Sequence, residues 1–243
     1  QKLSKRLNNY ADPLELFEKY GSDALRVTML SSTVVKGQEL LIDKEGKMVF
    51  DTLRLFIKPI WNAYHFFCLY ANIDEIKAQE GFDSQNVLDR YIISKLKIAV
   101  DKIKECLDAY DSQGAYEAIA AFFEVLNNWY IRRSRNRFWK SEKDQDKLGA
   151  YNTLYSCLNN MMKAASSLLP LVTEHIYLGL NDRQSSVHLT DFPTLNNVQP
   201  DKNLVEVMDQ VLDICSSALF IRSGENIRVR QPLASLKVYI ENS

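Results

Sequence analysis

The sequence is poor in glycine, proline, cysteine and histidine. Its 243 residues include 8 Gly, 6 Pro, 4 Cys and 3 His. So few turn-forming residues argue against a loop-rich β fold and favour long uninterrupted helices. The cysteines lie about 40 to 60 residues apart and form no CxxC or Cys/His cluster. We therefore expect no metal site in this stretch and a reducing, cytoplasmic location.

The sequence also lacks an excess of one charge and a long run of purely apolar residues. Its 30 Lys and Arg residues nearly balance 31 Asp and Glu residues, so the net charge of −1 does not indicate a nucleic-acid partner. Contact with RNA must then depend on a local basic patch. One stretch, residues 53–73, is mostly apolar, but Arg54, Lys58 and Pro59 interrupt it. Because a spanning helix needs about 20 mostly apolar residues, we expect a buried amphipathic helix there and no membrane association.

Apolar residues at helical spacing are abundant. The clearest stripe is Leu88, Ile92, Leu96, Ala99, Ile103 and Leu107. The same reasoning predicts helices over residues 13–20, 22–30, 48–72, 85–110, 115–140, 148–169, 170–179 and 202–222, an extended piece at 187–189 and a strand at 236–240. Asp12 is expected to cap the first helix, Ser22 or Asp23 the second, and Ser112 the fifth.

Long helices joined by short connections predict an antiparallel bundle over residues 46–195. Residues 1–45 are expected to end a preceding domain, and residues 196–243 to begin a following one. Because the chain starts at Gln1 and a basic motif follows at once, we interpret it as a fragment of a longer protein.

The basic motif is Lys2-Leu3-Ser4-Lys5-Arg6. Lysine is a mobile point charge and arginine a rigid fork of donors, so three cations and a hydroxyl in this segment suit a phosphate group. The alternative is a solvated loop, which is the commoner explanation of a short basic segment on its own.

The residues that follow favour the phosphate site. KLSKR and the segment NNYADPLELFEKYGSDALR (residues 8–26) resemble the KMSKS loop and the downstream helices of class I aminoacyl-tRNA synthetases. The resemblance implies that Lys5 is the principal ATP ligand, with Lys2 as a supporting cation and Ser4 nearby. In that family the loop closes over the triphosphate and stabilises charge as pyrophosphate leaves. Leu3 and Arg6 stand where the family has Met and Ser.

A second basic cluster ends the helix expected over residues 115–140. It combines five cations with two tryptophans: Trp129, Arg132, Arg133, Arg135, Arg137, Trp139 and Lys140. At helical spacing, Arg133, Arg137 and Lys140 share one face, and Arg132 and Arg135 form an adjacent row. Such cations can bind an RNA backbone, and the two tryptophans can stack on unpaired bases. The alternative is that the arginines pair with carboxylates of neighbouring helices and that Trp129 is a core residue.

Three further segments extend the resemblance. NWYIRRSRNRFW (residues 128–139), SVHLTDFP (186–193) and IRVRQPL (227–233) resemble segments of isoleucyl-tRNA synthetases. The resemblance implies a mainly α fold: a helical anticodon-binding bundle with short irregular or strand pieces at both ends. It also implies a parent isoleucine–tRNA ligase that uses ATP with Mg, takes tRNA(Ile) and isoleucine as partners, and works as a cytoplasmic monomer. We interpret His65, His175 and His188 as structural.

The HIGH-type motif, the other half of the family's ATP site, does not occur in this sequence. We therefore expect the fragment alone not to catalyse. Two alternatives stay open: a valyl-tRNA or another class I synthetase, and a non-enzymatic helical module that binds RNA generically. The arginine run and IRVRQPL count against the first, and KLSKR leading into KYGSDALR counts against the second.

Overall fold

The structure, a computed structural model, describes residues 11–39 and 45–239. Within these ranges the chain forms helices, turns and irregular segments but no strand, which confirms the mainly helical fold expected from the sequence. The chain divides into two compact units, residues 1–200 and 201–243. The domain boundary expected after residue 45 lies inside the first unit and stays a prediction.

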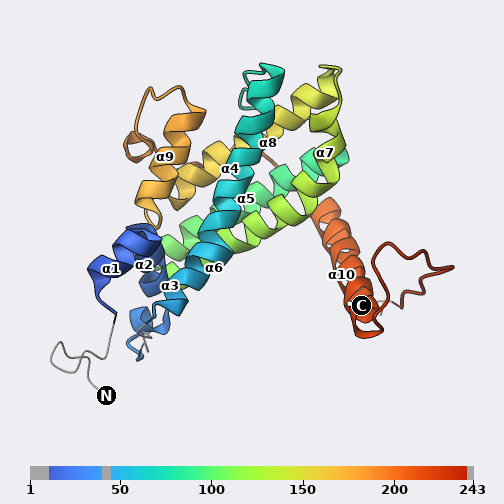
Figure 1. Cartoon of the computed structure of the whole chain (residues 1–243). Coiled ribbons are helices and arrows are strands. Elements are labelled where there is room, and N and C mark those ends of the chain that lie inside the picture. The colour runs from blue at the N-terminus through green and yellow to red at the C-terminus, as the bar shows by residue number, and fades with distance from the viewer. Residues whose placement is uncertain (1–10, 40–44, 240–243) are drawn as a thin grey trace. The chain divides into compact units, whose positions relative to one another are not determined.

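The first unit is built from helices of very different lengths (Figure 1). In chain order they are α1 (Pro13–Tyr20), α2 (Ser22–Leu30), α3 (Lys47–Thr52), α4 (Lys58–Asp74), α5 (Val87–Asp108), α6 (Ser112–Val125), α7 (Arg132–Trp139), α8 (Gln145–Ala165) and α9 (Pro170–Leu180). Helices α5 and α8 pack against each other, α6 packs on α5, and α9 packs on α8. Helix α4 contacts both α6 and α8 and crosses in front of them in Figure 1. The predicted stripe of α5 faces this core, since Ile92, Leu96 and Ile103 have no exposed surface.

Local capping sets the bounds of α1 as predicted. The Asp12 carboxylate accepts a hydrogen bond from the Leu14 N–H at 2.9 Å, which satisfies one of the free donors of the first turn. Gly21 ends the helix with φ +84°, a backbone conformation that favours glycine. The sequence alone therefore defines this element.

The cap predicted for α2 is wrong. Neither Ser22 nor Asp23 caps that helix, because Gly21 precedes it without a side-chain hydrogen bond. The Asp23 carboxylate instead accepts hydrogen bonds from the N–H groups of Leu171 (3.0 Å) and Val172 (2.7 Å). It thus caps α9, a helix far away in the sequence, and burial raises the pKa of this carboxyl although both hydrogen bonds oppose the shift.

Two π-helical turns interrupt the long helices. The first, η3 (Leu53–Ile57), ends two residues before Pro59 and joins α3 to α4 without a break. Because Pro59 has no N–H, the regular backbone hydrogen bond is missing there, and a wider turn accommodates the loss. The second, η4 (Leu126–Ile131), joins α6 to α7 in the same way.

Three further local predictions are wrong. Residues 187–189 form a short 3₁₀ helix, η5 (Val187–Leu189), rather than an extended piece. Residues 236–239 are irregular, so the expected strand does not form in the part of the chain that the structure describes. Helix α6 is capped by Asp111, not by Ser112, whose hydroxyl donates to the Leu30 carbonyl at 2.6 Å. A segment with a β-like sequence needs a partner strand, and neither residues 187–189 nor residues 236–239 have one within the described ranges.

The second unit contains α10 (Lys202–Gly224), which Asp201 caps. Near the end of this helix the Arg222 guanidinium donates to the carbonyls of Arg228 (2.6 Å), Val229 (3.2 Å) and Gln231. These bonds hold the following irregular segment against the end of its own helix. Over residues 11–39 and 45–239, no helix has both the length and the apolar character needed to cross a membrane.

Candidate nucleic-acid interface

The π turn η4 decides which way the basic segment faces. Helix α6 buries Ile119, Phe123 and Leu126, and a regular helix would continue that row to residues 130, 133 and 137. The residues actually buried after Leu126 are Trp129, Tyr130, Ile131, Ser134 and Phe138. The wider turn has shifted the register by one residue, so Arg133 leaves the core-facing row and is exposed.

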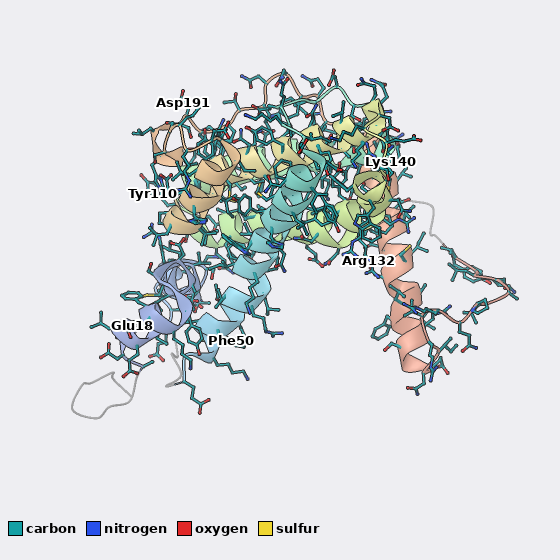
Figure 2. All side chains as sticks on the ribbon, turned by 45° about the horizontal axis from the view of Figure 1, so that its top comes forward. Glu18, Phe50, Tyr110, Arg132, Lys140 and Asp191 are labelled. Carbon is teal, nitrogen blue, oxygen red and sulfur yellow. The ribbon has the colours of Figure 1, made fainter. Side chains whose placement is uncertain are left out.

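The outward face of η4 and α7 carries polar and aromatic side chains at helical spacing. Its exposed members are Asn128, Arg132, Arg135, Asn136 and Trp139. Arg133 is exposed beside them, and we call Arg132, Arg133 and Arg135 the exposed arginine row. Among the residues that the structure describes, none of the three forms an ion pair with a carboxylate. Figure 2 shows Arg132 and Lys140 at the two ends of α7.

Two arginines of this row lie over tryptophan rings. The Arg133 Cζ atom is 5.2 Å from the ring centroid of Trp129, and the Arg135 Cζ atom is 6.0 Å from that of Trp139. Such contacts contribute about 0.5–1 kcal/mol at exposed sites and restrict the arginine side chain. Trp139 is 53% exposed, whereas Trp129 is 8% exposed. Trp139 can therefore stack on a base, whereas the ring of Trp129 is almost wholly buried.

Arg137 faces the interior. Its Nη1 and Nη2 atoms donate to the two carboxylate oxygens of Asp89 at 2.6 and 2.8 Å, and its Nε atom donates to Asp146 at 3.1 Å. The Asp89 side chain has no exposed surface and that of Arg137 is 11% exposed. Asp89 also accepts hydrogen bonds from the hydroxyls of Tyr130 (2.8 Å) and Ser84 (2.6 Å). The guanidinium of Arg137 is therefore already paired on both sides, as in the alternative in which the arginines pair with carboxylates of neighbouring helices.

The environment of this pair explains its titration. Burial by itself lowers the pKa of the Arg137 guanidinium, but hydrogen bonds from it to Asp89 and the charge of that carboxylate outweigh burial and raise the pKa. Burial raises the pKa of Tyr130 well above its ordinary value, and the neighbouring Asp89 adds to the shift. For Asp146, burial raises the pKa, but the hydrogen bond from Arg137, the charge of Arg137 and the hydrogen bonds from Asn86 and Lys140 together outweigh it, and the pKa is lowered. Arg137 therefore stays charged and Tyr130 stays neutral across the physiological range.

Lys140, another member of the expected phosphate-binding face, also forms ion pairs with carboxylates. Its Nζ atom lies 2.6 Å from Asp144 Oδ2 and 3.4 Å from Asp146 Oδ2. The neighbouring Lys147 has a side chain that is 1% exposed, and its Nζ atom lies 2.6 Å from Asp74 Oδ2 and donates to the Lys140 carbonyl at 2.6 Å. Carboxylates thus pair with the cations around the turn between α7 and α8.

Sequence reasoning missed the carboxylates that select among the arginines. Asp89 lies in the first turn of α5, where an acidic residue is usual because it favours the positive end of the helix dipole. An acidic residue at this position is therefore typical of an exposed helix start. No local sequence pattern shows that α7 and α8 cover Asp89. The one signal in the sequence is that an acidic residue starts an otherwise amphipathic helix.

The remaining candidates are the expected ATP ligands and the histidines. Lys2, Ser4 and Lys5, the expected ATP ligands, lie outside the described residues. His188 Nε2 is 3.0 Å from the Pro170 carbonyl, which agrees with a structural role. Within residues 11–39 and 45–239, no group of three or more His, Cys, Asp or Glu side chains is placed to hold a metal ion.

Comparison with known sequences gives this interface a context. The family described as "Anticodon-binding domain of tRNA ligase" matches residues 89–240. The chain belongs to this family. A second family, described as "tRNA synthetases class I (I, L, M and V)", matches residues 1–41. The exposed arginine row thus lies inside the anticodon-binding domain, and the KLSKR segment lies inside the synthetase match.

Individual relatives are similar over nearly the whole chain. It is 66% identical to the isoleucine–tRNA ligase of Rickettsia bellii (strain OSU 85-389) over 100% of its length. It is 64% and 63% identical to the isoleucine–tRNA ligases of Rickettsia prowazekii (strain Madrid E) and Rickettsia felis (strain ATCC VR-1525 / URRWXCal2), each over 98% of its length. The chain spans about a quarter of these relatives, 24%, 24% and 25% of their respective lengths.

A solved structure shares the fold of the anticodon-binding domain. The ternary complex of Agrobacterium radiobacter K84 agnB2 LeuRS with tRNA and LeuAMS matches with a TM-score of 0.60 at 18% sequence identity. The match covers 84% of this chain and 23% of that one.

Proposed function

We propose that this chain is the part of an isoleucine–tRNA ligase that binds the anticodon arm of tRNA(Ile) and also supplies the KMSKS-type loop for ATP. The observation that carries the proposal is the exposed arginine row. In a chain whose net charge is −1, three neighbouring arginines project from one helix with no carboxylate partner among the described residues. The high identity to isoleucine–tRNA ligases supports the choice of tRNA.

The geometry suits the backbone of a folded RNA. Arg132, Arg133 and Arg135 supply planar forks of donors that can each bind phosphate oxygens in bidentate fashion. Trp139, half exposed at the end of the same helix, offers a flat surface to an unpaired base. Phosphate contacts fix position without reading sequence, so the arginines provide affinity and Trp139 contributes to base recognition.

The test is the salt dependence of tRNA binding to the 243-residue chain. Replacing Arg132 and Arg135 together with alanine removes two contacts, so we expect weaker binding and a salt slope lower by up to about two units. The matched control is the double variant Lys102→Ala with Lys104→Ala, which changes the net charge equally on α5. An unchanged slope in the arginine variant, or an equal change in the control, would refute the interface.

We also propose that the full-length enzyme activates isoleucine with Mg-ATP and works as a cytoplasmic monomer. The role of the ATP loop needs a separate test in that full-length enzyme. Lys5 is expected to stabilise the departing pyrophosphate. Lys5→Ala should therefore slow isoleucine-dependent pyrophosphate exchange, because it raises the activation free energy by about 2.7–4 kcal/mol. Lys36→Ala, an exposed lysine within the same family match, is the control. Normal exchange in the Lys5 variant would exclude the assignment.

A further inference from the structure

We propose that Asp89 is a positioning residue for tRNA binding: its buried carboxylate fixes α7 through Arg137 and so sets the direction of the exposed arginine row. The proposal rests on the proposed function, because it concerns how that same interface is held. Asp89 itself does not touch the RNA, since its side chain has no exposed surface.

The contacts of Asp89 reach every element around the interface. Asp89 belongs to α5, and it accepts hydrogen bonds from Tyr130 of η4 at 2.8 Å, from Arg137 of α7 at 2.6 and 2.8 Å, and from Ser84 of the preceding loop at 2.6 Å. Arg137 continues the network to the first turn of α8, where its Nη2 atom donates to the Asp146 carbonyl at 2.8 Å. We call these five residues, Ser84, Asp89, Tyr130, Arg137 and Asp146, the Asp89 clamp.

The clamp holds α7 on both sides of the exposed arginine row. Tyr130 comes before Arg132, and Arg137 comes after Arg135. One carboxylate therefore binds the π turn that shifts the register and the helical turn that follows the row. A bidentate arginine–carboxylate pair fixes orientation as well as distance, and a side chain buried on a neighbouring helix gives the pair a rigid base.

The electrostatics make the proposal easy to separate from a simple charge effect. Asp89→Asn removes a negative charge near the RNA site, which by itself should strengthen binding to a polyanion. A positioning role predicts the opposite, because the asparagine can no longer hold both ends of the guanidinium and the arginines lose their alignment. If Arg137 could instead bind a phosphate once it is freed from Asp89, the same substitution would release its guanidinium and strengthen the binding of tRNA.

The experiment measures binding of an isoleucine tRNA transcript to the 243-residue chain at several salt concentrations, at a temperature where circular dichroism shows each variant to be folded. For Asp89→Asn we expect a Kd about tenfold higher and a salt slope lower by about one unit. Two controls lie on the same helix. Asp101→Asn makes the same charge change at an exposed site, and Ile103→Ala weakens the core where no surface is exposed; neither should raise the Kd.

A double-mutant cycle shows whether Asp89 acts through the row. In a background that carries Arg132→Ala and Arg135→Ala, Asp89→Asn should have little further effect on the Kd. A Kd for Asp89→Asn that is unchanged or lower, one that matches Ile103→Ala, or full additivity in the cycle overturns the positioning role. If the arginine double variant itself binds normally, the interface rather than the clamp is wrong.

Tyr130→Phe decides the matter should Asp89→Asn fail to fold. It removes the hydroxyl that donates to Asp89 but keeps the aromatic ring and the ion pair. We expect a Kd about threefold higher, again absent from the Arg132→Ala, Arg135→Ala background. A wild-type Kd for Tyr130→Phe would overturn the proposal.

Discussion

Replacing Arg137 tests whether its charge serves the fold. In Arg137→Ala the Asp89 carboxylate stays buried and loses both guanidinium bonds, at 2.6 and 2.8 Å. Removing one partner of a buried ion pair typically costs about 3–5 kcal/mol because the remaining charge is uncompensated. Tyr130 and Ser84 still donate to Asp89, which places the expected loss near the lower end, at about 3 kcal/mol.

The measurement is a urea titration of the 243-residue chain, followed by circular dichroism. Arg132→Ala is the matched control, since that arginine is exposed and its removal should change the free energy of unfolding by less than about 0.5 kcal/mol. Adding Asp89→Asn to Arg137→Ala removes the stranded charge, so the double variant should lose less than the sum of the single losses. A loss below about 1 kcal/mol for Arg137→Ala, or the same loss as for Arg132→Ala, would show that the pair does not stabilise the fold as described.

The remaining predictions concern helix glycines and acid stability. Gly149→Ala should stabilise α8 by about 0.5–1 kcal/mol, because the added Cβ meets its nearest neighbours at 3.5–3.8 Å; thermal unfolding measures this, and a lowered melting temperature would contradict it. Gly114→Ala should instead destabilise α6 by about 1 kcal/mol, because its Cβ overlaps the Asp111 carboxylate that caps the helix and lies 2.9 Å from a cysteine sulfur; an equal gain at both glycines would exclude the reasoning. The lowered pKa of Asp146 means that its ion pairs stabilise the fold above the unfolded pKa of about 3.9 and cease to do so as pH falls through the lower, folded value. Asp146→Asn should therefore flatten the loss of unfolding free energy as the pH falls from about 5 to about 3, a window that brackets the unfolded pKa of about 3.9. An unchanged pH profile would show that the pairs do not contribute.

The sequence by itself determined the helices and the candidate interface. Period-3.6 stripes need only local information, because the residues that share a face of a helix are three or four positions apart. The α5 stripe faces the core as predicted, with Leu88 and Leu107 partly buried at its ends, and Asp12 and Gly21 bound α1 through contacts within a few residues. The cluster of arginines was equally visible, since composition along one helix needs no knowledge of its neighbours.

The tertiary structure alone decided which arginines are exposed. A regular helix would have directed Arg133 inward, and the extra residue of a π turn reversed that. Arg137 has the same charge as Arg132, yet a carboxylate 48 positions away holds it in the interior. Asp23 likewise caps a helix 149 positions away. For Arg137 and Asp23 the physical reason is the same. A charged or polar side chain interacts with the groups that the fold brings within about 3 Å, and helix packing, which the local sequence does not determine, sets which groups these are.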